Sequence, residues 1–396
     1  MRFFLFLVCF LFSFPSLAAP STKYATPINR GVSWLIHKAN PNGSFGNIPG
    51  FKQQGHVGIT ALSIEALSMV LPYITSKKIA KKAISCIEKG TQYLLGCQEG
   101  SGAIYTKGSS LKPYETAIAL SALIEVQKRN LAIPGLNMAI QKAKNYLIRK
   151  QFDKPEGISP SQAIYGGWSE VSGTKETKEV TLAVTHVVLE ALHKAKVSKD
   201  SKVWKKVLFF LNRCQNRSES NDYREHGFFP FNDGGFIYQP GKSKAGVFRR
   251  KQGTGYYAKS YGSMTYAGLK SLVHANLTKE DPRVKAAFYW IQKHYTLEEN
   301  YGMGSGTNPQ GGKQGIFYYY MIMAKALDAY QIEKIKTLDG KVHYWRQELA
   351  NKLLSLQKKE GFWQNSNPRW WEGNSVLVTS YALIALGICC TKNKGE

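Results

Sequence analysis

Residues 180–191 read VTLAVTHVVLEA, a stretch in which hydrophobic side chains occupy nearly every position around a helix. A helix that is apolar on all sides is buried in the protein interior. The stretch recurs, because an anchor residue is followed six and seven positions later by a small residue and Leu. The anchors lie 55 to 80 residues apart, and they are Thr60, Thr116, Thr185, Thr265, Tyr320 and Thr379. This periodicity predicts six buried helices in a repeat protein.

A second type of helix precedes each buried one. In residues 77–95, apolar side chains form one stripe and lysines cover the opposite side. Matching segments centre on residues 34–35, 146–147, 210–211, 290–291 and 353–354. The alternation predicts an all-α fold, an α/α toroid of six helical hairpins with an inner ring of buried helices and an outer ring of amphipathic ones. An open superhelix of helix pairs is the alternative.

The segment LLSLQKKEGFW, residues 353–363, resembles the glutamine–tryptophan repeat of squalene and terpenoid cyclases. Weaker copies start at Gln98 and Gln151. Residues 233–236 (DGGF), together with residues 262–266 (GSMTY), resemble the corresponding repeat of protein prenyltransferase β subunits. The resemblance spans residues 27–390 and implies the α/α toroid, but a shared fold implies much less about chemistry.

The chemistry of these families does not carry over residue by residue. Cyclases of the squalene type resemble one another in an Asp-x-Asp-Asp acid motif, because protonation of an alkene needs a carboxyl group tuned by neighbouring carboxyls. No two aspartates of this chain lie within ten residues of each other. The Asp-x-Cys zinc ligands of prenyltransferases are also absent, so we predict no metal and no cofactor, and catalysis stays open. The resemblance still implies an aromatic cavity for an isoprenoid or another lipid.

The composition limits the classes of molecule that this protein is expected to bind. Among 396 residues, 53 Lys and Arg face 27 Asp and Glu, which gives a net charge of +26. With 43% hydrophobic residues the chain has enough apolar surface to fold, which excludes a disordered protein. The charge favours anionic ligands such as a diphosphate or an acidic glycan, and peripheral contact with a membrane surface. A nucleic acid would match the positive charge, but the N-terminal segment described next predicts export from the cell. We therefore exclude nucleic acid as a partner.

The N-terminus has the features of a cleavable signal peptide, residues 1–19. A positive start precedes an apolar run over residues 3–14, which is too short to span a bilayer, and small residues follow. This predicts a secreted or periplasmic monomer with one domain, residues 20–396. An odd number of cysteines remains, so at least one thiol is unpaired in the monomer. They are Cys86, Cys97, Cys214, Cys389 and Cys390.

Residues 216–259 form the longest segment between predicted helices, and they mix basic with aromatic side chains. Such a mixture binds phosphates by charge and flat apolar groups by stacking. The alternative is a solvated cover over one mouth of the toroid.

Candidate site residues gather at the N-terminal turns of the buried helices, where unpaired backbone N–H groups favour an anion. The ligand-binding candidates are His56, Tyr114, Lys259, Tyr261, Lys313, Tyr318, Arg369, Trp370 and Trp371. The catalytic candidates are the carboxylates Glu115, Glu179, Glu372 and Asp233. For His56 the alternative to ligand binding is a role as the cap of its helix. We expect His186 to be a core residue whose hydrogen bonds are satisfied.

Three functions follow from these observations. The first is binding or transformation of an isoprenoid or another lipid in a central aromatic cavity. The second is binding or cleavage of an acidic polysaccharide, where cleavage needs two carboxyl groups about 5–10 Å apart. The third is a toroid that binds a ligand without catalysis.

Overall fold

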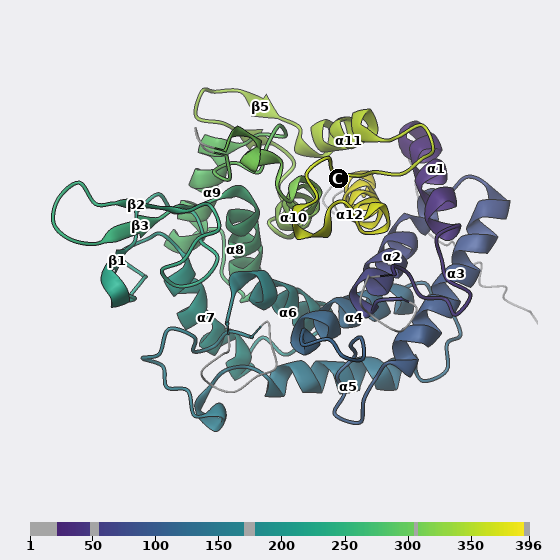
Figure 1. The fold of residues 1–396 in the computed structure, drawn as a ribbon, viewed down its shortest axis with the longest axis horizontal. Coiled ribbons are helices and arrows are strands. Elements are labelled where there is room, and N and C mark those ends of the chain that lie inside the picture. Colours follow the sequence, from purple (N-terminus) through teal and green to yellow (C-terminus); the bar gives the residue numbers. More distant parts are fainter. Residues whose placement is uncertain (1–21, 48–54, 170–178, 305–307, 392–396) are drawn as a thin grey trace, which may run out of the picture.

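The computed structural model describes residues 22–47, 55–169, 179–304 and 308–391 (Figure 1). The predicted signal peptide, residues 1–19, lies outside the described residues. Within the described ranges the chain is mostly helical, and its twelve α-helices form two concentric rings (Figure 1). The predicted all-α class is therefore confirmed, with a few short strands as the exception.

The inner ring consists of helices that are buried over most of their length. They are α2 (Val57–Val70), α4 (Lys112–Gln127), α6 (Leu182–Lys194), α8 (Gly262–His274), α10 (Ile316–Ala329) and α12 (Ser375–Cys390). Each inner helix packs against the next, and α12 packs against α2. The ring is therefore closed, which leaves no exposed end to cap and contradicts the open superhelix.

The outer ring consists of amphipathic helices. They are α1 (Ala25–Ile36), α3 (Lys77–Gly96), α5 (Leu136–Arg149), α7 (Lys202–Cys214), α9 (Pro282–His294) and α11 (Trp345–Leu356). In α7, for example, Val203, Val207 and Phe210 are buried, whereas Lys202 and Lys205 are exposed. Short 3₁₀ helices lie at Thr22–Tyr24, Leu71–Tyr73, Lys154–Glu156, Glu225–Gly227, Pro309–Lys313 and Arg369–Trp371.

The anchor threonines of the repeat hold the loop within each hairpin. The Oγ1 atom of Thr379 accepts the backbone N–H of Trp363 at 3.1 Å, and Thr185 accepts that of Trp168 at 3.2 Å. Equivalent bonds join Thr60 to Phe45, Thr116 to Ile104 and Thr265 to Phe236. A buried N–H without a partner costs about 1–3 kcal/mol, so this position requires a hydroxyl group.

A glutamine of the repeat ties four of these five loops to the next outer helix. The amide of Gln357 donates to the carbonyl of Gly361 in its own loop at 2.8 Å and to the carbonyl of Pro27 in α1 at 2.9 Å. Gln98 and Gln151 make equivalent pairs of bonds. The pair made by Gln357 connects the last hairpin to the first and so closes the ring.

Gln215 makes the same two bonds, to the carbonyls of Gly234 and Arg283. It is absent from the predicted repeat copies because residues 216–233 separate it from Gly234 and Phe236, the glycine and aromatic residue that mark the motif. The glutamine contact therefore occurs four times in the described residues, although the sequence pattern marks only three copies.

Residues 216–259 depart from the helical pattern. They contain a sheet of three short strands, β1 (Phe228–Phe229), β2 (Val247–Arg249) and β3 (Tyr256–Ala258), in the order β1–β3–β2. Strand β1 runs parallel to β3, and β2 runs antiparallel to it. The β2–β3 hairpin projects outward from the ring, so it does not cover a mouth of the toroid (Figure 1). A second antiparallel pair joins β4 (Ile335–Lys336) to β5 (Val342–His343).

Two further observations concern the described residues alone. None of their helices is both long enough and apolar enough to cross a bilayer. Their five cysteines are all free thiols.

Glycine is required where a hairpin loop touches the next outer helix, and this generates a test. Gly361 has a φ of +102°, and a Cβ there would lie 2.6 Å from the carbonyl oxygen of Arg30. Gly340 also has a positive φ, +86°, but nothing lies within 4 Å of its Cβ position. Gly340→Ala should therefore cost only the backbone strain, about 1–2 kcal/mol of unfolding free energy.

Gly361→Ala should cost about 1–3 kcal/mol more than Gly340→Ala, because the added methyl group pushes α1 away from the loop. Urea unfolding of both variants measures the difference. Equal losses would show that contact between the loop and α1 does not hold the ring together.

Candidate functional site

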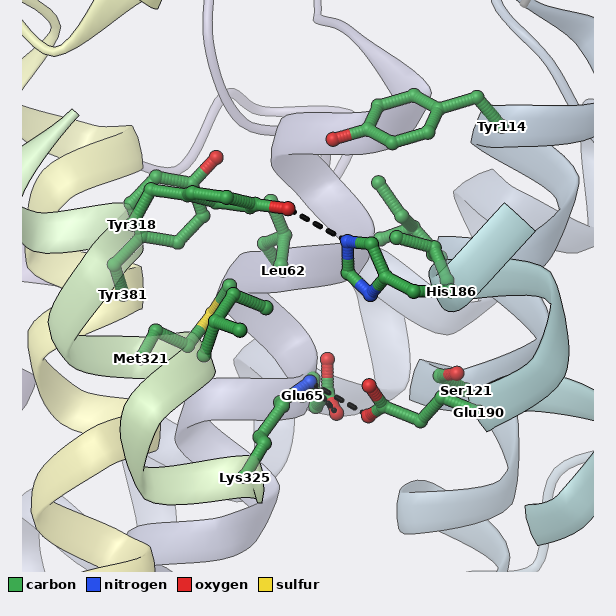
Figure 2. A pocket seen from close by; sticks show the side chains of 13 residues that line it. Leu62, Glu65, Tyr114, Ser121, His186, Glu190, Tyr318, Met321, Lys325 and Tyr381 are labelled. Atoms are coloured by element: carbon green, nitrogen blue, oxygen red, sulfur yellow. Dashed lines mark hydrogen bonds and ion pairs between the residues drawn. The ribbon is translucent and has the colours of Figure 1, made fainter. Parts of the chain in front are cut away.

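The inner helices enclose a small cavity on the axis of the toroid, here called the central cavity (Figure 2). Its volume is about 20 Å³, which is space for about one water molecule. Pockets for organic ligands usually measure about 300–1,000 Å³. The expected hollow for an isoprenoid is therefore filled by side chains. The lining residues are Leu62, Glu65, Tyr114, Ile118, Ser121, His186, Val187, Glu190, Tyr318, Met321, Ile322, Lys325 and Tyr381.

Aromatic side chains close one end of the central cavity. The Nε2 atom of His186 lies 2.6 Å from the Oη atom of Tyr318, and Tyr114 and Tyr381 lie on the same side of the cavity (Figure 2). Burial, aided by the charge of Lys270, holds the pKa of His186 well below its usual range, so the imidazole is neutral. Its Nδ1 atom has no hydrogen-bond partner among the described residues. His186 is thus a core residue, as expected, with one ring nitrogen bonded to a protein group.

Charged side chains close the other end. This charged layer consists of Glu65, Glu125, Glu190, Lys194, Lys270 and Lys325. The Nζ atom of Lys325 lies 2.8 Å from Glu190 and 3.2 Å from Glu65, and Lys270 also pairs with Glu190. Three carboxylates and three ammonium groups thus meet across the axis. None of them was a predicted site residue.

The pKa values within the charged layer follow from burial and pairing. Burial alone would raise the pKa of Glu190, but the ammonium groups of Lys270, Lys325 and Lys194 outweigh it and hold that pKa well below its usual range. For Lys270, burial prevails over the attraction of Glu190 and lowers the pKa to about 8. Buried charges persist only where they are paired, so the layer is a structural closure of the axis.

A sequence signal for the charged layer did exist. Glu65, Glu190, Lys270 and Lys325 each stand five residues after an anchor of the repeat, in helices that are otherwise apolar. Charged residues are almost never fully buried unless they are paired. Equivalent positions of a closed ring face one another, so two acidic and two basic residues at this position indicate ion pairs across it.

Glu372 caps the N-terminus of α10. Its two carboxylate oxygens accept the backbone N–H groups of Tyr318 at 2.7 Å and Phe317 at 3.3 Å, and Asn365 donates a third bond at 2.6 Å. Burial raises the pKa of Glu372 to about 7, although these hydrogen bonds oppose the shift. The side chain is fully buried, so this catalytic candidate serves as an anchor within the protein.

Glu115 has a similar role beside α2. It accepts the backbone N–H of Thr106 at 2.8 Å and the hydroxyl of Thr106 at 2.7 Å, and Ser109 bonds to it as well. The Nε2 atom of His56 lies 3.7 Å away, and burial lowers the pKa of His56 although the charge of Glu115 raises it. The Nδ1 atom of His56 accepts the N–H of Gly58, so its expected role as a helix cap is confirmed.

The neighbouring loops also pair other N–H groups at the starts of inner helices. Val57 of α2 donates to Thr106 at 2.9 Å, and Leu182 of α6 donates to the carbonyl of Tyr238 at 2.8 Å. Together with the cap on α10, these bonds occupy several of the N–H groups at the starts of α2, α6 and α10, where the anion was expected.

An exposed tryptophan pair lies just before α12. Trp370 and Trp371 have φ values of +54° and +67°, a region that bulky side chains rarely adopt, and their side chains are 41% and 48% exposed. The ring of Trp371 meets the edge of His56 at a centroid distance of 5.7 Å. The guanidinium of Arg369 lies 5.3 Å from the ring of Trp370. Strained aromatic residues at a surface are typical of binding sites.

The remaining candidates lie apart from this group. Tyr261 is buried at the start of α8, Lys259 is half-buried, and exposed Lys313 donates to the carbonyl of Glu298. Exposed Glu179 lines a surface groove.

Asp233 holds its own loop. It accepts hydrogen bonds from the N–H of Gly235, the hydroxyl of Ser260 and the indole of Trp290. Burial raises its pKa. The structure therefore brings together His56, Tyr114, Glu115, Tyr318 and Glu372 with the turn Arg369–Trp371. Lys259, Glu179 and Asp233 do not contact this group among the described residues.

The chain matches no protein-family model and no curated protein. Solved structures do resemble it. Type II terpene cyclase MstE from Scytonema has 12% sequence identity and a TM-score of 0.53, over 91% of this chain and 97% of that one. A family 76 glycoside hydrolase (mannosidase) from Bacteroides thetaiotaomicron has 12% identity and a TM-score of 0.54, over 91% and 98%.

An inactive α-1,6-mannanase variant from Salegentibacter in complex with α-1,6-mannotetrose has 8% identity and a TM-score of 0.53, over 93% of this chain and 99% of that one. At such identities the likeness concerns the fold alone. The fold is the α/α toroid. The predicted resemblance to terpenoid cyclases in fold is thus confirmed, and mannanases share it.

The raised pKa of Glu372 predicts a pH dependence of stability. A carboxyl group whose pKa is about 7 when folded and 4.5 when unfolded favours the native state at low pH, and this contribution is lost as the pH rises between those values. The wild type should lose about 3 kcal/mol of unfolding free energy between pH 4.5 and 7 relative to Glu372→Gln.

Urea unfolding across this pH range measures the effect. The control is Glu360→Gln, which changes an exposed glutamate and should run parallel to the wild type. A Glu372→Gln curve parallel to the wild type would show that Glu372 stays ionised in the folded protein.

Proposed function

We propose that this protein is an exported monomer that binds an acidic polysaccharide at the mouth where the inner helices begin. The observation that carries the proposal is the exposed Trp370–Trp371 pair beside His56. Flat indole faces pack against the apolar faces of sugar rings, whereas the central cavity has space for about one water molecule. We also propose that the toroid has six helical hairpins, the number that the sequence repeat predicts.

Charge supports an acidic ligand. The chain carries a net charge of +26, and a groove of about 390 Å³ near the start of α6 adds basic and aromatic groups. The groove is lined in part by Tyr238, Lys242, Lys244 and Tyr256, and the Nζ atom of Lys244 lies 4.4 Å from the centre of the Tyr238 ring. Ammonium groups beside aromatic rings suit the carboxylates and ring faces of uronic acids.

The geometry supports binding over cleavage. Hydrolysis of a glycosidic bond needs an acid and a second carboxylate that both reach the substrate. Glu115 and Glu372 are fully buried, and both are occupied by hydrogen bonds within the protein. The mannanase variant that holds α-1,6-mannotetrose supports the idea that a toroid of this kind accommodates an oligosaccharide.

A second candidate is an isoprenoid or another lipid on the axis. The aromatic lining of the central cavity favours it, and a variant of MstE has been solved with its product, merosterolic acid A. Such a ligand would require Tyr114 and Tyr318 to move apart. Mass spectrometry of an organic extract of the purified protein tests this, since a stoichiometric lipid supports the second candidate and its absence rejects it.

The polysaccharide proposal predicts that the tryptophans dominate binding. Trp370→Ala/Trp371→Ala should weaken binding of polygalacturonate about 10-fold or more, because both stacking surfaces are lost. Isothermal titration calorimetry measures the dissociation constant, with neutral mannan as the comparison ligand. The matched control is Tyr289→Ala/Tyr344→Ala, which removes two aromatic rings with similar exposure, 53% and 52%, from elsewhere on the chain.

The control variant should bind like the wild type. Wild-type protein that binds neither polymer, or equal losses in both double variants, would refute the proposed function.

A further inference from the structure

The small sheet in residues 216–259 has two faces with different surroundings. One face carries Phe228 and Ala258, which are buried against Ile237. The strand register places Phe229 and Phe248 both beside Tyr257, so these three rings share the opposite face. Phe231, just beyond β1, joins them. These four side chains are here called the aromatic face.

The rings of the aromatic face form one cluster that is partly open to solvent. Phe231 lies 4.8 Å from Phe248 and 5.4 Å from Tyr257, and Phe248 lies 5.2 Å from Tyr257, between ring centroids. Phe231 is 45% exposed, and the other three rings are each partly exposed. A contiguous exposed aromatic cluster on a folded protein marks a contact surface.

The β2–β3 hairpin carries charge of one sign. Residues 242–259 contain six basic residues and no acidic residue, whereas the acidic residues Glu219, Asp222 and Glu225 precede β1. The guanidinium of Arg250 lies 3.8 Å from the centre of the Phe229 ring, on the aromatic face. Arg249 alternates with Phe248 and so lies on the opposite face of the sheet, where it is exposed, and Lys251 is exposed just beyond β2. Basic groups therefore flank the aromatic face within one hairpin, whose backbone projects from the ring (Figure 1).

We propose that the β2–β3 hairpin docks this protein onto an anionic phospholipid membrane. Aromatic rings settle at the boundary between lipid headgroups and acyl chains, while lysine and arginine are attracted to anionic headgroups. Either signal alone gives weak attachment, and here the two coincide. A hairpin that projects from the ring reaches a planar partner, whereas a polysaccharide chain is better held in a groove. The docking surface is separate from the Trp370–Trp371 pair.

Flotation of the full chain with phospholipid vesicles tests this inference. The protein should float with vesicles of phosphatidylcholine and phosphatidylglycerol, but not with phosphatidylcholine alone. Arg249→Gln/Lys251→Gln should weaken the affinity about 30-fold, since each surface charge contributes about a factor of five. The matched control is Lys77→Gln/Lys78→Gln, which removes two exposed charges from α3 and should keep near wild-type binding.

The Phe231→Ser variant distinguishes a membrane from a soluble polyanion as the partner of the hairpin. If the rings enter the interface, this variant should lose the part of vesicle binding that survives high salt, because that part does not depend on charge. Inositol hexakisphosphate should compete only partially with vesicles.

Three results would overturn the inference: no binding to anionic vesicles, equal losses in the two charge variants, or an unchanged Phe231→Ser together with full competition by inositol hexakisphosphate. The last result would indicate a site for a soluble polyanion. Trp370→Ala/Trp371→Ala should leave flotation with vesicles unchanged. Flotation therefore tests only the membrane proposal, and calorimetry tests the polysaccharide proposal.

Discussion

The closed ring joins its two ends by the packing of α12 against α2 and by the paired hydrogen bonds of a partly buried glutamine amide. In the last hairpin, Gln357 connects the carbonyl of Gly361 to that of Pro27, some 330 residues away in the sequence. Arg30 adds bonds from α1 to the carbonyls of Lys358 and Lys359. Four hairpins make this contact, and in each of them the glutamine bonds to backbone carbonyls, so the side chains of the outer helix it reaches are not needed for it.

Closure also determines what lies on the axis. Inner helices that run in the same direction place equivalent repeat positions at the same height, so Glu65, Glu190, Lys270 and Lys325 meet in one layer. On the other side of the central cavity, Tyr318 and His186 meet in a second layer. Between them remains a space of about 20 Å³. The axis of this toroid is filled by side chains, so both proposed binding surfaces lie outside it, at the mouth and on the projecting hairpin.

The buried carboxylates have structural roles in place of the catalytic roles that were predicted for them. Glu372 and Glu115 were predicted as catalytic groups because they stand near inner-helix N-termini. In the structure both satisfy backbone N–H groups: Glu372 joins the last hairpin to α10, and Glu115 holds the loop of its own hairpin. Trp371 lies at the same mouth with a strained backbone and a half-exposed ring that packs against His56, and strained residues of this kind gather at functional sites.

The sequence by itself determined the helical repeat, whereas closure of the ring was decided by the packing of α12 against α2. Thr379 and Gln357 bond to backbone groups of short loops, and such local partners leave a regular spacing that can be read directly. Only the tertiary structure decided the size of the central cavity, the pairing of the charged layer and the strands in residues 216–259. These features depend on side chains from helices that are up to 260 residues apart, as Lys325 and Glu65 are, or on strands of two or three residues, which are too short to leave a periodic pattern.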